Sequence, residues 1–148
     1  MNYEIVTLEE KKIVGIAART GNAEPDMHAV IGGLWQNFYQ GNICQKIESK
    51  VSEYAYGIYS DYRNETYQVT VGAEVSESGK NEEFDTMLIP NGKYAKFQVV
   101  GDMVKDVAEA WAKIWQMDLN RIYTADFEEY VDFDGNISTV NIYVAIGA

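Results

Sequence analysis

The segment from Phe127 to Tyr130 carries the side chains whose chemistry stands out most in this sequence. Successive side chains of a β-strand point to opposite faces, so Glu128 and Tyr130 are expected to share one face. The same spacing puts Gly57 and Tyr59 on one face of an earlier predicted strand. A carboxylate among aromatic rings, shielded from water, suits a lipophilic cation, because the rings attract the cation and the carboxylate neutralises it. Such a carboxylate is also a reasonable general base, because burial raises its pKa.

The elements that must position these side chains follow from the spacing of apolar residues. In residues 66–75, apolar or aromatic side chains recur at every second position, which is typical of a strand with one buried face. Residues 27–40 instead gather their apolar side chains on one helical face. The full set of predicted elements comprises strands at 3–8, 13–18, 55–62, 66–75, 85–89, 93–100, 124–131 and 139–146, with helices at about 27–40 and 102–117.

Two details of the predicted helices carry further expectations. Gly32 and Gly33 lie inside the first helix, where each glycine costs about 1 kcal/mol of helix propensity relative to alanine. Close packing against another backbone would be one reason for tolerating them. Asp102 stands at the start of the second helix and is predicted to cap it.

The two halves of the chain repeat one order of elements. Residues 33–40 of the first helix align with residues 109–116 of the second, and residues 56–62 align with 127–133. We therefore predict an α+β fold of duplicated βαββ units, about 1–76 and 77–148, in a single domain spanning 1–148. The expected architecture is a mostly antiparallel sheet with two main helices on one face and a central groove, since interfaces between repeats are common ligand sites.

The repeat also singles out a site, because it breaks at one position. The alignment pairs Tyr59 with Tyr130, but it pairs Gly57 with Glu128. One carboxylate, two phenols and an open space beside the glycine are therefore expected in the groove.

A purely structural role is the alternative for each of these residues. Most glutamates are simply solvated, and aromatic residues at helical spacing, such as Trp35 and Trp111, are core residues more often than ligand contacts. Glu129 is expected to be the exposed neighbour of Glu128, unless a β-bulge exchanges the faces of the two residues.

Composition excludes several classes of function. The 148 residues suit one domain, and 47% of them are hydrophobic, as in a globular core. The net charge of −11 disfavours nucleic acids and anionic membranes as partners. One cysteine, Cys44, and one histidine, His28, exclude an intramolecular disulfide and a usual zinc site, and no metal or cofactor is expected. Neither a signal peptide nor an apolar run long enough for a membrane span is visible, so a cytoplasmic protein is expected.

Short blocks in a fixed order then carry a family resemblance. From about Tyr3 to Ile146 the chain resembles the GyrI-like effector-binding family, which includes ligand-binding domains of AraC- and MerR-type multidrug regulators and stand-alone integron-cassette proteins. The blocks are Leu34-Trp35-x-x-Phe38, Tyr56-Gly57-Ile58-Tyr59, Val71-Gly72-Ala73-Glu74-Val75, Ile89-Pro90-x-Gly92-x-Tyr94-Ala95-x-Phe97, Trp111-x-x-Ile114-Trp115, Phe127-Glu128-x-Tyr130 and Ile142-Tyr143-Val144.

The resemblance implies a groove for lipophilic, often cationic, small molecules. It makes Glu128 the buried acidic anchor of the groove. The remaining ligand contacts that it implies are Trp35, Tyr59, Trp111 and Tyr130, with Tyr143 as an addition. Gly57, which the repeat singles out, and Phe38 complete the predicted ligand contacts. Regulators of the family carry a DNA-binding helix-turn-helix domain. Here the family-like region starts within the first few residues, so direct binding of nucleic acid is not expected.

Three functions therefore remain open at the level of sequence. The first is a stand-alone binding protein for lipophilic, cationic compounds. The second is a hydrolase of cyclopropane-containing genotoxic compounds, in which Glu128 and Tyr130 would be the catalytic pair. The third is a protein-interaction module that acts on a regulator or on DNA gyrase, with an acidic surface that imitates DNA.

Overall fold

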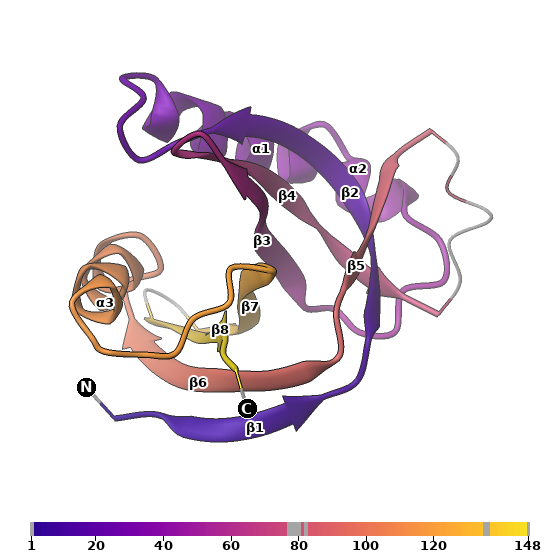
Figure 1. The fold of residues 1–148 in the computed structure, drawn as a ribbon. Helices are drawn as coiled ribbons and strands as arrows, with labels where there is room; N and C mark the ends of the chain where they lie inside the picture. The colour runs from indigo at the N-terminus through magenta and orange to yellow at the C-terminus, as the bar shows by residue number, and fades with distance from the viewer. Residues whose placement is uncertain (1, 77–80, 82, 135–136, 148) are drawn as a thin grey trace.

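A single curled sheet organises the molecule (Figure 1). The computed structural model describes residues 2–76, 81, 83–134 and 137–147. The strands follow the order β1-β6-β8-β7-β3-β4-β2-β5, and each neighbouring pair is antiparallel. The elements are β1 (Glu4–Leu8), β2 (Lys11–Thr20), α1 (Met27–Gln40), α2 (Ile43–Lys46), β3 (Ala55–Arg63), β4 (Thr66–Val75), β5 (Asp85–Ile89), β6 (Gly92–Gly101), α3 (Lys105–Trp115), β7 (Ala125–Asp134) and β8 (Ile137–Ala145).

The strand order is symmetric about the contact between β3 and β7. On one side follow β4, β2 and β5, and on the other side follow β8, β6 and β1. Gly57 lies directly opposite Glu128 at this contact, so residues that are equivalent in the repeat meet across the symmetry axis. Strand β1 pairs with β6, and β5 pairs with β2. The first strand of each half, β1 or β5, therefore pairs with a strand of the other half, and this pairing holds the two halves together.

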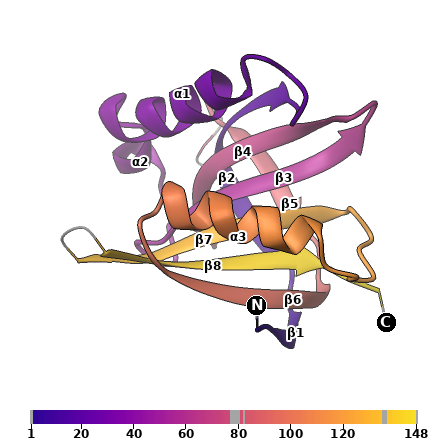
Figure 2. The ribbon, with the colours of Figure 1, turned by 90° about the vertical axis from the view of Figure 1, so that its left-hand side faces the viewer.

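The two main helices lie on the same face of the sheet, as the α+β prediction required (Figure 2). Trp35 of α1 reaches the strand face beside Gly57, and the indole of Trp111 from α3 reaches Glu128 on the neighbouring strand. No helix in the described ranges is long and apolar enough to cross a membrane.

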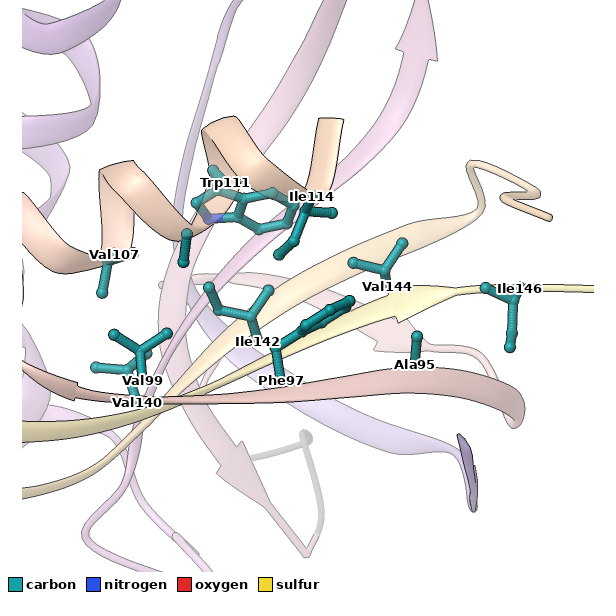
Figure 3. Packing of buried hydrophobic residues seen from close by; sticks show 11 residues of the cluster. Ala95, Phe97, Val99, Val107, Trp111, Ile114, Val140, Ile142, Val144 and Ile146 are labelled. Carbon is teal, nitrogen blue, oxygen red and sulfur yellow. The ribbon is translucent and has the colours of Figure 1, made fainter. Parts of the chain in front are cut away.

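Separate apolar clusters hold the layers together. Beneath α3, Trp111 and Ile114 pack on Phe97 and on the apolar face of β8 (Figure 3). Beneath α1, Leu34 and Phe38 pack on β4. A third cluster fills the opposite face of the sheet and contains Tyr56, Phe127 and Tyr143, among other buried residues. Both faces of the central strands are therefore buried, which forces polar side chains there to find partners.

Asp126 anchors the beginning of β7 to three other segments. Its buried carboxylate accepts hydrogen bonds from the Ala145 N–H at 2.8 Å, the Tyr62 hydroxyl at 2.6 Å and the Arg121 guanidinium at 2.7 Å. Arg121 also lies over the ring of Tyr123, with 4.4 Å from guanidinium carbon to ring centroid. This network fixes the strand that carries Glu128 to β3, to β8 and to the connection from α3.

Local details of the two long helices differ in part from the prediction. Helix α3 begins at Lys105, three residues later than expected, because Asp102 lies in the turn before it. The Asp102 carboxylate nevertheless caps the helix by accepting the N–H groups of Val104 and Lys105 at 2.9 and 2.6 Å. The short helix α2 was not among the predicted helices. Residues 77–80 and 82, in the connection from β4 to β5, and residues 135–136, in the connection from β7 to β8, lie outside the described residues.

The interpretation of Gly32 and Gly33 as close-packing positions is wrong. A Cβ added at either residue would meet nothing within 4 Å. Gly32→Ala is therefore expected to raise the free energy of unfolding by about 0.5–1 kcal/mol, because alanine favours the helix without a clash. Urea unfolding followed by circular dichroism measures this effect. As a control, Gly15→Ala should destabilise strongly, since its Cβ would collide with the Val71 carbonyl oxygen. A loss of stability in Gly32→Ala would contradict the assignment.

Candidate functional site

Glu128 lies at the centre of the sheet, on the face that the helices cover, and is only 4% exposed. Its Oε2 accepts hydrogen bonds from the Trp111 indole N–H at 2.6 Å and from the Tyr59 hydroxyl at 3.1 Å. Its Oε1 accepts the Tyr130 hydroxyl at 2.8 Å. No lysine, arginine or histidine in the described part of the chain lies within ion-pair distance. The carboxylate is thus held only by neutral donors.

Burial dominates the electrostatics of this group. It raises the pKa of Glu128 above the ordinary 4.5, while the hydrogen bonds from Trp111, Tyr130 and Tyr59 oppose the shift. Burial and the nearby carboxylate also raise the pKa of both Tyr59 and Tyr130, so the two phenols stay neutral donors. A cation beside Glu128 would favour its ionised form and lower its pKa.

The space beside Gly57 is occupied, contrary to the expectation of an open space. A Cβ at Gly57 would lie 3.1 Å from Trp35 Cζ2 and 3.2 Å from Glu128 Oε1. Trp35 packs edge-on against Tyr130, with ring centroids 4.8 Å apart, and stacks on Tyr39 at 6.1 Å. The absent side chain at Gly57 therefore lets an indole edge lie against the sheet next to the carboxylate.

The remaining candidates from the sequence divide between the two faces of the sheet. Phe38 is fully buried in the core under α1. Its ring packs edge-on against Trp35, with ring centroids 6.3 Å apart, and so helps to hold Trp35 in place. Tyr143 pairs with Phe127 across the strands, so its side chain lies on the face opposite Glu128. The structure therefore brings Trp35, Tyr59, Trp111 and Tyr130 to Glu128 and does not bring Tyr143 there.

The burial of the neighbouring carboxylate, that of Glu129, was missed at the level of sequence. The expectation that Glu129 is exposed is wrong, since it is 9% exposed. It accepts hydrogen bonds from the Tyr56 hydroxyl at 2.9 Å, the Asn141 amide at 3.0 Å and the Tyr143 hydroxyl at 3.3 Å. Because these donors come from β3 and β8, only the pairing of the strands reveals them.

One cavity borders the aromatic side chains that surround Glu128. It measures about 170 Å³ and shares Tyr130 with the surroundings of Glu128. Another, of about 200 Å³, lies between α3 and β6, and the charged residues Asp106, Glu109 and Lys113 are among those that line it. Glu128 lines neither cavity, so a ligand reaches its carboxylate only if the aromatic side chains over it move.

The raised pKa of Glu128 predicts a specific dependence of stability on pH. The folded state holds the proton of this carboxyl more tightly than the unfolded chain does. The contribution of Glu128 to stability is therefore complete below pH 4.5 and is lost as the pH rises through the folded pKa. Urea unfolding at a series of pH values should show this loss in the wild type and not in Glu128→Gln. Parallel pH profiles for the two proteins would contradict the assignment, and the exposed Glu9→Gln serves as control.

The fold and the buried group together define a class of protein. A symmetric antiparallel sheet, with two helices on one face and a buried glutamate among aromatic side chains, is the arrangement expected of a GyrI-like effector-binding domain. The chain belongs to the family of integron-associated effector-binding proteins, whose family model matches residues 4–146. It is therefore an effector-binding protein, that is, a protein that binds small molecules.

Solved structures show the same fold. An integron cassette protein from the mobile metagenome of Vibrio cholerae has 27% identity and a TM-score of 0.80, covering 98% of this chain and 95% of that one. SAV2435, solved bound to tetraphenylphosphonium, has 20% identity and a TM-score of 0.79, covering 97% and 94%. The C-terminal domain of EcmrR has 16% identity and a TM-score of 0.66, covering 99% of each chain. A comparison with curated protein sequences gives no significant match.

Proposed function

We propose that this protein binds lipophilic cations at Glu128, between helices α1 and α3. The observation that carries the proposal is a carboxylate that is 4% exposed and receives hydrogen bonds only from neutral donors. Ionising such a group costs free energy unless a positive charge lies beside it. A bound cation supplies that charge, and the surrounding rings attract it through their electron-rich faces.

The four aromatic side chains have different parts in this proposal. Trp111 is 8% exposed and belongs to the core cluster under α3, so it keeps its place and holds Glu128. Trp35 and Tyr130 are only partly buried, and their edge-on contact covers the carboxylate. Their displacement opens the site, and the bound cation replaces their contacts with Glu128.

The relatives support a cation as the ligand. SAV2435 has the same fold and was solved with tetraphenylphosphonium, a cation whose charge is enclosed by phenyl groups. The family to which this chain belongs is defined by effector binding. The acidic surface, with a net charge of −11, favours cations over anions at long range as well.

Two isosteric ions of opposite charge test the proposal. Tetraphenylphosphonium and tetraphenylborate have nearly the same shape, so charge is the main difference between them. We expect calorimetric titration to show tetraphenylphosphonium binding with a dissociation constant on the order of micromolar, about −8 kcal/mol. Tetraphenylborate should bind far more weakly. Equal affinities would show that apolar contact, rather than Glu128, drives binding, and would contradict the proposal.

A further inference from the structure

The cavity of about 170 Å³ beside Tyr130 has features of a built site. Its walls come from the last turn of α1, the residues just before and at the start of β3, the turn before α3, the middle of β7 and the start of β8. Tyr130 forms one wall and also donates its hydroxyl to Glu128. The side chain of Tyr130 therefore lies between the cavity and the buried carboxylate of Glu128. The residues that line it are Tyr39, Glu53, Ala55, Met103, Tyr130, Val131 and Ser138.

Ser138 is the first feature that points to a ligand. Its side chain is 2% exposed, and its Oγ has no hydrogen-bond partner among the described residues. Ser138 lies on the same face of β8 as Val140 and Ile142, which pack under α3, so its side chain is on the helix-covered face of the sheet. Buried hydroxyl groups are normally paired, so this oxygen is available to a polar group that enters the cavity.

Charge is the second feature. Glu53 contributes an exposed carboxylate to the lining, and none of the lining residues is a lysine, arginine or histidine. A negative charge at the mouth and an unpaired hydroxyl inside favour a cationic group that can donate hydrogen bonds. Stacked rings of Tyr39 and Trp35, and the contact of Trp35 with Tyr130, form an aromatic path from this cavity to Glu128.

We propose that the cavity is an outer subsite for the second charged end of an elongated ligand. The inner, lipophilic cation of the ligand lies at Glu128. A primary ammonium or amidinium at its other end donates to Ser138 Oγ and Glu53. The preferred ligands of this protein are therefore elongated dications with one N–H-bearing end. This inference rests on the proposed function, since it assigns the outer part of the same binding site.

Two matched probes test the subsite. Hexyltriphenylphosphonium carries only the inner cation, and aminohexyltriphenylphosphonium adds a terminal ammonium. The ammonium is expected to improve the affinity of the wild type roughly 10-fold, the usual size for charge-assisted hydrogen bonds. Glu53→Gln and Ser138→Ala should each remove this gain and leave the affinity for hexyltriphenylphosphonium unchanged. The exposed Glu9→Gln should keep the gain.

The stability of Ser138→Ala gives an independent readout. Removing an unpaired hydroxyl should not lower the melting temperature, so a lost gain in this variant cannot be assigned to misfolding. Retention of the gain in either Glu53→Gln or Ser138→Ala, or its absence from the wild type, would overturn the subsite but leave the proposed function standing. If hexyltriphenylphosphonium itself fails to bind the wild type, both the subsite and the proposed function are wrong.

Discussion

Replacement of Glu128 by glutamine is expected to weaken tetraphenylphosphonium binding by about 100-fold, near 3 kcal/mol, because it removes the one charge that is buried with the cation. A carboxylate that is 4% exposed interacts with a bound cation through little intervening water. The shape of the site is nearly unchanged by the substitution. The loss should therefore appear in the dissociation rate of the complex as well as in the equilibrium titration.

The fold is expected to survive this substitution because the hydrogen bonds can be rearranged. The glutamine carbonyl can accept from Trp111 and Tyr59 at the position of Oε2. The glutamine amide can donate to the Tyr130 hydroxyl at the position of Oε1, since a phenol can accept as well as donate. Near-ultraviolet circular dichroism and the melting temperature check that the variant is native.

Glu129→Gln is the matched control for this experiment. Glu129 is the neighbouring residue on the same strand, is 9% exposed and also accepts three hydrogen bonds, but on the opposite face of the sheet. Its variant has the same net charge as Glu128→Gln and should bind tetraphenylphosphonium like the wild type. An equal loss of affinity in both variants would show that the total charge of the protein or a disturbance of the sheet weakens binding. Glu128 would then not be the residue that neutralises the bound cation.

Removal of Asp126 is expected to have the largest effect on stability. Asp126→Ala leaves Arg121 without its partner and the Ala145 N–H without its acceptor, and it also frees the Tyr62 hydroxyl. Breaking a buried ion pair by removing one partner typically costs about 3–5 kcal/mol, since the other charge stays buried and unpaired. Urea unfolding of the purified variant measures this loss.

A surface ion pair provides the comparison for Asp126. Glu4 lies 3.9 Å from Lys96 and its side chain is 68% exposed, so Glu4→Ala should cost less than about 1 kcal/mol. If Asp126→Ala were no more destabilising than Glu4→Ala, the network at the start of β7 would not be what fixes this strand. In that case the placement of Glu128 would depend on the apolar clusters alone.

Much of the fold could be predicted because local periodicity is strong in this chain. The predicted bounds of α1, β4 and β5 agree with the structure. In α1 and β4 the apolar side chains follow the spacing of one helical face or one strand face. The exchange of β1 and β5 between the halves was not predicted. Pairing between strands that are distant in sequence leaves no local pattern, so only the assembled sheet shows it.

In the candidate site, too, the features set by local spacing could be predicted, and those set by packing between distant segments could not. The repeat made Gly57 and Glu128 equivalent residues, which the sheet places opposite each other. The strand period put Tyr130 on the same face as Glu128, and Tyr59 on the same face as Gly57, without knowledge of the sheet. Neither pattern could show that Tyr143 lies on the face opposite Glu128, because that placement depends on the register of β8 against β7. For the same reason, the burial of Glu129 was not foreseen. The filling of the space beside Gly57 depends instead on how Trp35 of α1 packs on the sheet.

The functional alternatives are narrowed to different degrees. Membership in an effector-binding family supports small-molecule binding. The hydrolase and the protein-interaction module stay predictions that require their own assays. Product analysis with activated cyclopropanes tests the first of these, and a supercoiling assay with DNA gyrase tests the second.

A crystal structure of the protein with tetraphenylphosphonium tests the central claim most directly. We expect the phosphonium between α1 and α3, with a phenyl group in contact with the Glu128 carboxylate and with Trp35 or Tyr130 displaced from its present position. Trp111 should keep its hydrogen bond to Glu128. A cation bound elsewhere on the molecule, with the contact between Trp35 and Tyr130 and the three hydrogen bonds of Glu128 intact, would contradict the account.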